Sequence, residues 1–380
     1  MSTASQAIFI HSPALDQGGY PDHCPFNSRR AGQTRQRALS MGLLQGSDRR
    51  EAAPVALTRE ELEWFHAPAY LDALRRAQDG QHDLSALGMG LGTPDCPIFP
   101  GLYDFACLAA GGTVTGARLI LSGEAHVAFN PSGGFHHAGR ATAAGFCYVN
   151  DIVLAAEALA RAGKRVLFLD IDVHHSDGVQ DAFYARGDVM TISLHENGRT
   201  LFPGTGWETE TGAGAGEGCT VNLPLPVGTY DAIYEWAFTE AALPLMKAYD
   251  PDVIMVELGM DALAGDPLAH LNLTNNVHAD LLDRVLRLGK PVLATGGGGY
   301  NVENTVRGWT LCWSVLCGDH AAQQDMMLGM GGVMLENTDW LGGLRDRALL
   351  SHAGRRAEID AEVQRVVGYI KTHVFPRHGL

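Results

Sequence analysis

Acidic and imidazole side chains alternate where an apolar run ends. The run RVLFLDIDV (165–173) has the pattern of a buried strand and leads into HHSDG, so Asp170, Asp172 and His174 occupy every second position. On an extended chain such residues share one face. Two carboxylates buried in an apolar strand cannot both stay ionised without a cation or strong hydrogen-bond donors. Mixed Asp and His ligands favour zinc or another divalent transition ion over calcium, which takes oxygen ligands. A pair of aspartates that caps the following helix is the alternative interpretation.

A further acidic residue, Asp261, comes directly after the apolar run DVIMVELG (252–259). Neighbouring parallel strands bring their carboxyl ends together at one edge of a sheet. Asp172, His174 and Asp261 would then provide three protein ligands and leave zinc a fourth position for water or substrate. An open position of this kind is typical of catalytic zinc sites, whereas structural zinc sites are closed.

Two adjacent histidines, His136 and His137, lie in the glycine-rich loop NPSGGFHHAG (130–139), which follows another strand-like run. Histidines in a loop at the same sheet edge suit acid–base chemistry at neutral pH. A carboxylate on the second nitrogen of each ring would orient it, and Asp170 and Asp177 are the carboxylates left for this purpose.

A run of four glycines ends in Tyr300, again at the end of a strand-like run (291–297). A tyrosine hydroxyl aimed at a polarised carbonyl would stabilise the oxyanion that develops there. The chain contains neither GxSxG nor GxxxxGK[ST], which argues against a serine-hydrolase elbow and a P-loop.

The segments that must position these residues alternate along the chain. Apolar runs predict strands at 7–10, 125–129, 165–173, 189–195, 252–259 and 291–297, and helical patterns predict helices at 149–164, 229–249 and 275–290. Such alternation predicts an α/β fold, with a mostly parallel sheet covered by helices on both faces. Without a repeat or linker, we expect one domain over residues 1–380, with an amphipathic C-terminal helix at about 356–373 packing on it. We interpret the methionine-rich piece at 325–334 as flexible core or hinge.

Composition narrows the class of protein. The 380 residues carry a formal net charge of −15, which opposes binding to nucleic acid or anionic membranes. Neither a signal peptide nor a long uninterrupted apolar stretch is recognisable. The seven cysteines are scattered and never spaced as CxxC, which favours buried thiols in a reducing cytoplasm over a disulfide framework. We therefore expect a cytoplasmic protein.

Taken together, the motifs resemble those of the zinc-dependent histone deacetylases, especially the class I branch and the bacterial acetoin-utilisation proteins. The matching blocks are NPSGGFHHAG, GFCYVND (145–151), DIDVHHSDGVQDAFY (170–184), TISLHENGRTLFPGTG (191–206), GMDALAGDPLAHLNLT (259–274) and GGGGYN (296–301). The resemblance spans roughly residues 7 to 315. It implies the arginase-like α/β fold and hydrolysis of an acyl amide on a lysine or a similar amine.

The resemblance also implies roles for single residues. His137 would be the general base and then the general acid, with Asp177 as its carboxylate partner. His136, paired with Asp170, would help to hold and polarise the attacking water. The zinc ligands would be those derived above, with Fe2+ as an alternative metal, and Tyr300 would polarise the scissile carbonyl.

Further positions match the family's substrate tunnel and its potassium sites. Phe146 and Phe202 match the aromatic walls, with Gly145 against the floor, and Asp95 matches the rim aspartate that holds the substrate backbone. The remaining substrate-side positions are Arg30 in the inner channel, Phe135 and Leu268. Potassium would bind through Asp170, Asp172, His174, Ser193 and Leu194, and a second potassium through backbone carbonyls near Phe183, Arg186, Val189 and Cys219.

Three positions depart from the family pattern. Ser176 stands where many members carry glycine, Phe135 where class I enzymes often carry tryptophan, and Met260 where alanine or phenylalanine is common. These differences leave the preferred acyl chain open rather than the hydrolysis itself.

Four functions remain to be compared. The main hypothesis is a deacylase acting on acyl-lysine in proteins or peptides, and an acetylpolyamine amidohydrolase is its rival within the family. A binuclear manganese ureohydrolase on the same fold would need additional metal ligands, so metal stoichiometry separates it. An acyl-lysine reader or an inactive relative should lack a ligand or the tyrosine. Physiological substrate and oligomeric state stay open.

Overall fold

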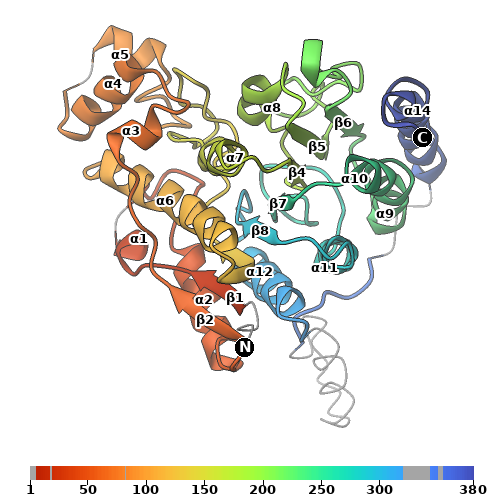
Figure 1. The fold of residues 1–380 in the computed structure, drawn as a ribbon, viewed down its shortest axis with the longest axis horizontal. Coiled ribbons are helices and arrows are strands. Elements are labelled where there is room, and N and C mark those ends of the chain that lie inside the picture. The colour runs from red at the N-terminus through yellow and green to blue at the C-terminus, as the bar shows by residue number, and fades with distance from the viewer. Residues whose placement is uncertain (1–5, 18, 82, 320–342, 350–353) are drawn as a thin grey trace.

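Short runs rich in valine, leucine and isoleucine form one parallel sheet. The computed structural model describes residues 6–17, 19–81, 83–319, 343–349 and 354–380, and within them eight strands pair in the order β2-β1-β3-β8-β7-β4-β5-β6 (Figure 1). All pairings are parallel. The strands are β1 (Gln6–Ile10), β2 (Arg49–Ala52), β3 (Ala125–Asn130), β4 (Val166–Asp170), β5 (Val189–Glu196), β6 (Thr220–Leu225), β7 (Val253–Glu257) and β8 (Val292–Thr295). The predicted α/β class with a mostly parallel sheet is confirmed.

The strand predictions were incomplete at the two edges of the sheet. All six predicted strands exist, but β2 and β6 were missed. The β2 sequence RREA is charged because it lies at an edge, and β6 (TVNLPL) contains Asn and Pro, which weaken a strand signal.

Helices cover both faces of this sheet (Figure 1). The longer ones are α2 (Arg30–Ser40), α4 (Pro68–Gln78), α6 (Leu102–Leu121), α7 (Asp151–Arg161), α11 (Asn275–Leu286), α12 (Val302–Leu316) and α14 (Arg356–His373). The shorter ones are α1 (Ala14–Gln17), α3 (Arg59–Leu62), α5 (Leu84–Gly88), α8 (Asp177–Phe183), α9 (Asp231–Ala237) and α10 (Leu243–Tyr249).

The predicted helices all form, with adjusted ends. The helix predicted at 149–164 is α7, and Asn150 caps it by accepting a hydrogen bond from the N–H of Val153 at 3.0 Å. The helix predicted at 229–249 consists of α9, a π-helical turn (Phe238–Ala242) and α10. The C-terminal prediction matches α14, which packs against β6 and α9.

Strand residues alternate between two cores, one on each side of the sheet. In β4, Leu167 and Leu169 belong to the core beneath α9–α12 and α14, whereas Val166 and Phe168 belong to the core beneath α4, α6 and α7. Alternation of this kind follows from the two-residue period of a strand. Asp170 continues the second series, so its side chain leaves the sheet on the α6–α7 side.

Helix α6 was not predicted, and its glycines explain why. Gly112 and Gly116 lie in its interior, where glycine weakens a helical pattern. A Cβ atom on Gly112 would lie 2.6 Å from the Asn130 side chain, and one on Gly116 would lie 2.5 Å from Leu293. The glycines therefore allow α6 to lie close against β3 and β8. Among the described helices, α6 also has the length and apolar character of a membrane span, but it is mostly buried here, as a core helix is.

All seven cysteines lie in described residues and none forms a disulfide, as predicted. The methionine-rich piece at 325–334, interpreted above as core or hinge, lies outside the described residues.

Candidate active site

The predicted metal ligands lie together just beyond the carboxyl ends of β4 and β7. We had expected Asp172 and His174 to lie in an extended strand. Because β4 ends at Asp170, they lie in the following turn instead. They converge because the aspartates bond locally: Oδ1 of Asp170 accepts from the N–H of Asp172, and Oδ1 of Asp172 from the N–H of His174, both at 2.9 Å. Asp261 joins them by accepting from the N–H of Val173 at 3.0 Å.

This group fits a transition metal. One donor atom from each of Asp172, His174 and Asp261 lies within 4.8 Å of the others, and all three side chains are buried. Nδ1 of His174 is 3.1 Å from Oδ1 of Asp172 and 3.0 Å from Oδ2 of Asp261. That Asp261 oxygen accepts no hydrogen bond from the described residues, which is costly for a buried carboxylate. One nitrogen and two carboxylate donors match the ligands that zinc takes.

The pKa values of this group show that it requires positive charge. Burial and the negative charge of Asp172 raise the pKa of Asp261 to about 7. Although burial opposes it, the carboxylates of Asp261 and Asp172 raise the pKa of His174 to about 10. A proton on His174 thus supplies the positive charge that a metal would bring, and metal binding must displace that proton.

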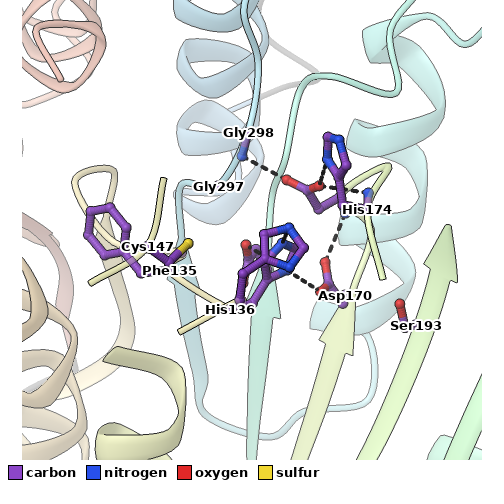
Figure 2. Close-up of polar contacts among 12 residues, drawn as sticks. Phe135, His136, Cys147, Asp170, His174, Ser193, Gly297 and Gly298 are labelled. Carbon is purple, nitrogen blue, oxygen red and sulfur yellow. Dashed lines mark hydrogen bonds and ion pairs between the residues drawn. The ribbon is translucent and has the colours of Figure 1, made fainter. Parts of the chain in front are cut away.

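His136 and His137 form a continuous chain with two carboxyl groups. Nδ1 of His136 is 2.8 Å from Oδ2 of Asp170 (Figure 2). The Nε2 atoms of His136 and His137 are 3.0 Å apart, and Nδ1 of His137 is 2.7 Å from Oδ1 of Asp177. Both histidines are buried. The structure therefore brings the predicted acid–base pair and its predicted carboxylates together.

The two carboxyl groups at the ends of this chain have pKa values shifted in opposite directions. Although burial opposes its ionisation, the contact with His137 holds the pKa of Asp177 below its ordinary value. Burial and the charge of Asp172 raise the pKa of Asp170 well above its ordinary value. Burial and His136 lower the pKa of His137 to about 4, so this ring is neutral at pH 7 and can accept a proton at Nε2.

Two residues that the sequence reasoning passed over hold the histidine loop. Asp151, at the start of α7, accepts hydrogen bonds from the N–H groups of Gly134 at 3.0 Å and Phe135 at 2.7 Å. The side-chain amide of Asn150 donates to the carbonyls of His136 and Ala138 at 3.1 and 3.0 Å. Asn150 and Asp151 belong to the block GFCYVND, so the sequence pattern contained them. Only Gly145 and Phe146 of that block were predicted to have a role.

Aromatic rings stand on either side of the metal-binding group. The Phe202 ring lies 4.9 Å from that of His137, and the Phe146 ring lies 5.5 Å from that of Tyr300, measured between centroids. Phe202 is exposed. Gly145 has a φ of 53°, and a Cβ atom there would lie 2.4 Å from Cδ2 of His137, so this close approach requires glycine.

Two aspartates hold the loops that carry these aromatic rings. Oδ2 of Asp95 accepts from the N–H of Gly145 at 2.9 Å, so the predicted rim residue holds the wall loop. Asp266, another residue that sequence reasoning did not single out, accepts from the N–H groups of Tyr300 at 2.7 Å and Leu268 at 2.9 Å. Burial and the charges of Asp261 and Asp172 raise the pKa of Tyr300 well above its ordinary value, so its hydroxyl stays a donor.

Arg30 and Phe135 lie deeper than the aromatic walls. Both line a small internal cavity together with Leu15, Phe26 and Trp309 among other residues. The buried Arg30 guanidinium donates to the carbonyl of Gly297 at 3.0 Å, from below the glycine run. Phe135 packs in a buried cluster with Leu15 and Cys147. These two residues are thus placed behind the metal-binding group rather than around the entrance.

Of the predicted ligands of the first potassium, Ser193 and Leu194 lie on β5, beside the strand that ends at Asp170. Ser193 is the register partner of Asp170, and Leu194 follows it in β5 (Figure 2). The second predicted set lies at the end of α8 and the starts of β5 and β6, where the carbonyl of Phe183 accepts from the N–H of Arg186 and that of Cys219 from Thr191.

A buried histidine behind the histidine loop should make stability depend on pH. Nε2 of His66 accepts from the N–H of Asn150 at 3.0 Å, and burial lowers the pKa of His66 to about 4, from an ordinary value of 6.5. Because the folded state binds this proton less well than the unfolded state, the contribution is intact above pH 6.5 and is lost as pH falls towards 4. We expect His66→Gln to remove about 3 kcal/mol of this dependence, from the pKa difference. Urea unfolding between pH 7 and 4 measures the free energy of unfolding of both proteins. An equal loss of this free energy with falling pH in wild type and variant would contradict the prediction.

The fold and this site define a hydrolase of the deacetylase class, and comparison with known proteins gives the family. The family model for the histone deacetylase domain matches residues 24–316. The chain therefore belongs to the histone deacetylase family. Curated relatives agree: it is 38% identical to "Histone deacetylase 8" of Danio rerio over 322 residues, covering 83% of this chain and 82% of that protein.

Other relatives include both the eukaryotic class I branch and bacterial proteins. "Histone deacetylase RPD3" of Saccharomyces cerevisiae is 38% identical over 81% of this chain and 71% of its own length. "Acetoin utilization protein AcuC" of Bacillus subtilis is 37% identical over 81% of each chain. The crystal structure of a histone deacetylase homologue from Aquifex aeolicus superposes with a TM-score of 0.81 at 29% identity, covering 95% of this chain and all of that one. The branch and the deacetylase-like fold expected from the motifs are confirmed.

Proposed function

We propose that this deacetylase removes acetyl or other acyl groups from lysine side chains of proteins. The observation that carries the proposal is the buried group of Asp172, His174 and Asp261 directly beside the His136–His137 pair. The Phe146 and Phe202 rings, which contact Tyr300 and His137, would form the walls along a linear chain such as an acylated lysine. We propose one zinc ion per chain at this group, with Fe2+ as the alternative metal.

Zinc held by these ligands would supply Lewis-acid chemistry, lowering the pKa of a water molecule and polarising the carbonyl. His137 would accept a proton at Nε2 and deliver it to the leaving amine, because its Nδ1 is held by Asp177. His136 would orient the attacking water from the side of Asp170. The Tyr300 hydroxyl would donate to the oxyanion.

One observation favours the manganese ureohydrolase as a second candidate. His136, Asp172 and Glu257 form another buried set of donors within 4.8 Å of one another, sharing Asp172 with the first set. Against it, Nδ1 of His136 is already in contact with Asp170 at 2.8 Å. Metal analysis of the purified protein separates the two functions, since the deacylase needs one divalent ion per chain and the ureohydrolase needs two.

The deciding experiment measures release of free lysine from an acetyl-lysine peptide by the zinc-loaded protein. Longer acyl-lysine peptides and acetylpolyamines form the comparison panel. Turnover of the peptides well above that of the polyamines supports the proposal. Turnover restricted to acetylpolyamines would replace it with the rival from the same family, and binding without turnover would favour a reader.

Tyr300 provides a separate test of oxyanion stabilisation. We expect Tyr300→Phe to lower kcat by about 10²–10³-fold, because one oxyanion donor is lost. KM should change little, since the ring that packs on Phe146 remains. Steady-state kinetics on the acetyl-lysine peptide measures both constants. A kcat within a factor of two of the wild type would remove Tyr300 from the mechanism.

Two further proposals concern the surroundings of the site. We propose that potassium binds at Asp170 and Ser193, where activity should respond to exchange of potassium for a larger monovalent cation. We also propose a cytoplasmic location, based on the thiol content.

A further inference from the structure

A row of polar side chains crosses the sheet at the level where the active site begins. Register pairs join Asn130 to Thr295, Thr295 to Glu257, Glu257 to Asp170, and Asp170 to Ser193. Paired residues in neighbouring strands point to the same face. All five are buried, although the residues before them in the same strands are apolar. The sheet thus changes from apolar to polar along one line, directly beneath the histidine loop.

Glu257 is the member of this row whose burial needs an explanation. Its side chain is fully buried, and neither carboxyl oxygen has a hydrogen-bond partner among the described residues. Asp170, Asp172 and Asp261 lie nearby and add like charge. A buried carboxyl without partners destabilises a fold, and an apolar residue of the same size would avoid that cost.

Among the described residues, the ring of His136 makes an ion-pair contact with Glu257. Oε1 of Glu257 is 3.2 Å from Nδ1 of His136, the same nitrogen that lies 2.8 Å from Oδ2 of Asp170. Two carboxyl groups from adjacent strands therefore converge on one ring nitrogen. Nδ1 is thus at hydrogen-bonding distance from Asp170 and in ion-pair contact with Glu257, while Nε2 lies 3.0 Å from Nε2 of His137.

We propose that Glu257 is a positioning residue for His136, and that it acts together with Asp170 as a pair of carboxyl groups that fixes the orientation of the ring. The inference rests on the proposed function, in which His136 orients the attacking water. It assigns to Glu257 a role that no residue of the zinc group or of the His137–Asp177 pair performs.

The test compares two replacements of Glu257 with a control on the same row. Glu257→Gln keeps a group that can hydrogen-bond to Nδ1, and its kcat should stay close to that of the wild type. Glu257→Met keeps the length but cannot hydrogen-bond, and kcat should fall about ten- to one hundredfold because ring misplacement is costly. KM and zinc content should not change. Thr295→Val alters the neighbouring position, whose hydroxyl also lacks a partner, and should leave kcat unchanged.

Thermal unfolding separates positioning from a structural role. Because neither carboxyl oxygen of Glu257 has a hydrogen-bond partner in the described part of the chain, Glu257→Met should have a Tm equal to or above that of the wild type while its kcat falls. A fall in Tm together with kcat would overturn the proposal in favour of a structural role. A kcat in Glu257→Met equal to that of the wild type would also overturn it. Two metal ions in the wild type and one in Glu257→Met would make Glu257 a metal ligand instead.

A spectroscopic readout keeps this inference independent of the proposed reaction. In protein labelled with 15N-histidine, the His136 resonances are assigned by their loss in His136→Asn. We expect Glu257→Met to shift the Nδ1 resonance of His136 and Thr295→Val to leave it in place. If the wild type does not hydrolyse acyl-lysine, the proposed function fails, yet this shift still supports the contact. An unshifted resonance in Glu257→Met overturns the inference whatever the activity.

Discussion

Replacement of Asp261 by alanine is expected to leave the protein unable to hold its metal and to lower kcat by about 10³-fold or more, because Lewis-acid activation is worth several kcal/mol. One carboxylate oxygen of Asp261 accepts no hydrogen bond from the described residues. Asp261 follows β7, whereas Asp172 and His174 follow β4. The measurement is metal content per chain after dialysis, with kinetics on the acetyl-lysine peptide.

A matched control is available on the surface. Asp79 is exposed at the end of α4, so Asp79→Ala removes one carboxylate without touching the site. It should retain one metal per chain and full activity. Retention of metal and activity by Asp261→Ala would show that this group does not form the metal site. Chelation of the wild type should reproduce the loss, and added zinc should restore activity.

The second large effect is expected at His137, where replacement by alanine should lower kcat by about 10²–10⁴-fold, the usual contribution of a general acid–base group. Metal content should not change, because His137 is not among the metal donors. The histidine is buried and neutral at pH 7, its Nδ1 is held by Asp177, and its Nε2 lies 3.0 Å from Nε2 of His136.

Exposed His126 on β3 serves as the control for this substitution. His126→Ala should keep wild-type kinetics. If His137→Ala also loses metal, the loss of activity has a structural cause and the general-base role is not supported. Full activity in His137→Ala would exclude that role outright.

The α/β class and six of the eight described strands were predicted from the sequence, and the predicted metal ligands lie close together in the structure. Asp172, His174 and Asp261 were placed together from motif and topology, and the structure brings them within 4.8 Å. The reason given for their alignment was partly wrong, since the strand ends at Asp170 and local aspartate turns complete the convergence. Turn geometry of this kind depends on side-chain bonds that periodicity does not report.

What the sequence reasoning missed has a common physical basis. Glu257, Asp151 and Asp266 act on the site through contacts with residues far away in the chain, and single-sequence patterns carry no such information. A buried glutamate inside VIMVE was nevertheless a visible irregularity in an apolar run. Edge strand β2 and glycine-rich α6 were missed because tertiary packing, rather than local propensity, stabilises them.

The position of β8 in the sheet has a consequence for biosynthesis. This strand lies between β3 and β7, although it is the last strand along the part of the chain that the structure describes. Until residues 292–295 leave the ribosome, the nascent chain can build only two half-sheets, each with an open edge that invites wrong pairing. All three metal donors are made before that point, whereas Tyr300 emerges just after it. Assembly of a working enzyme is therefore delayed until the two halves close around β8.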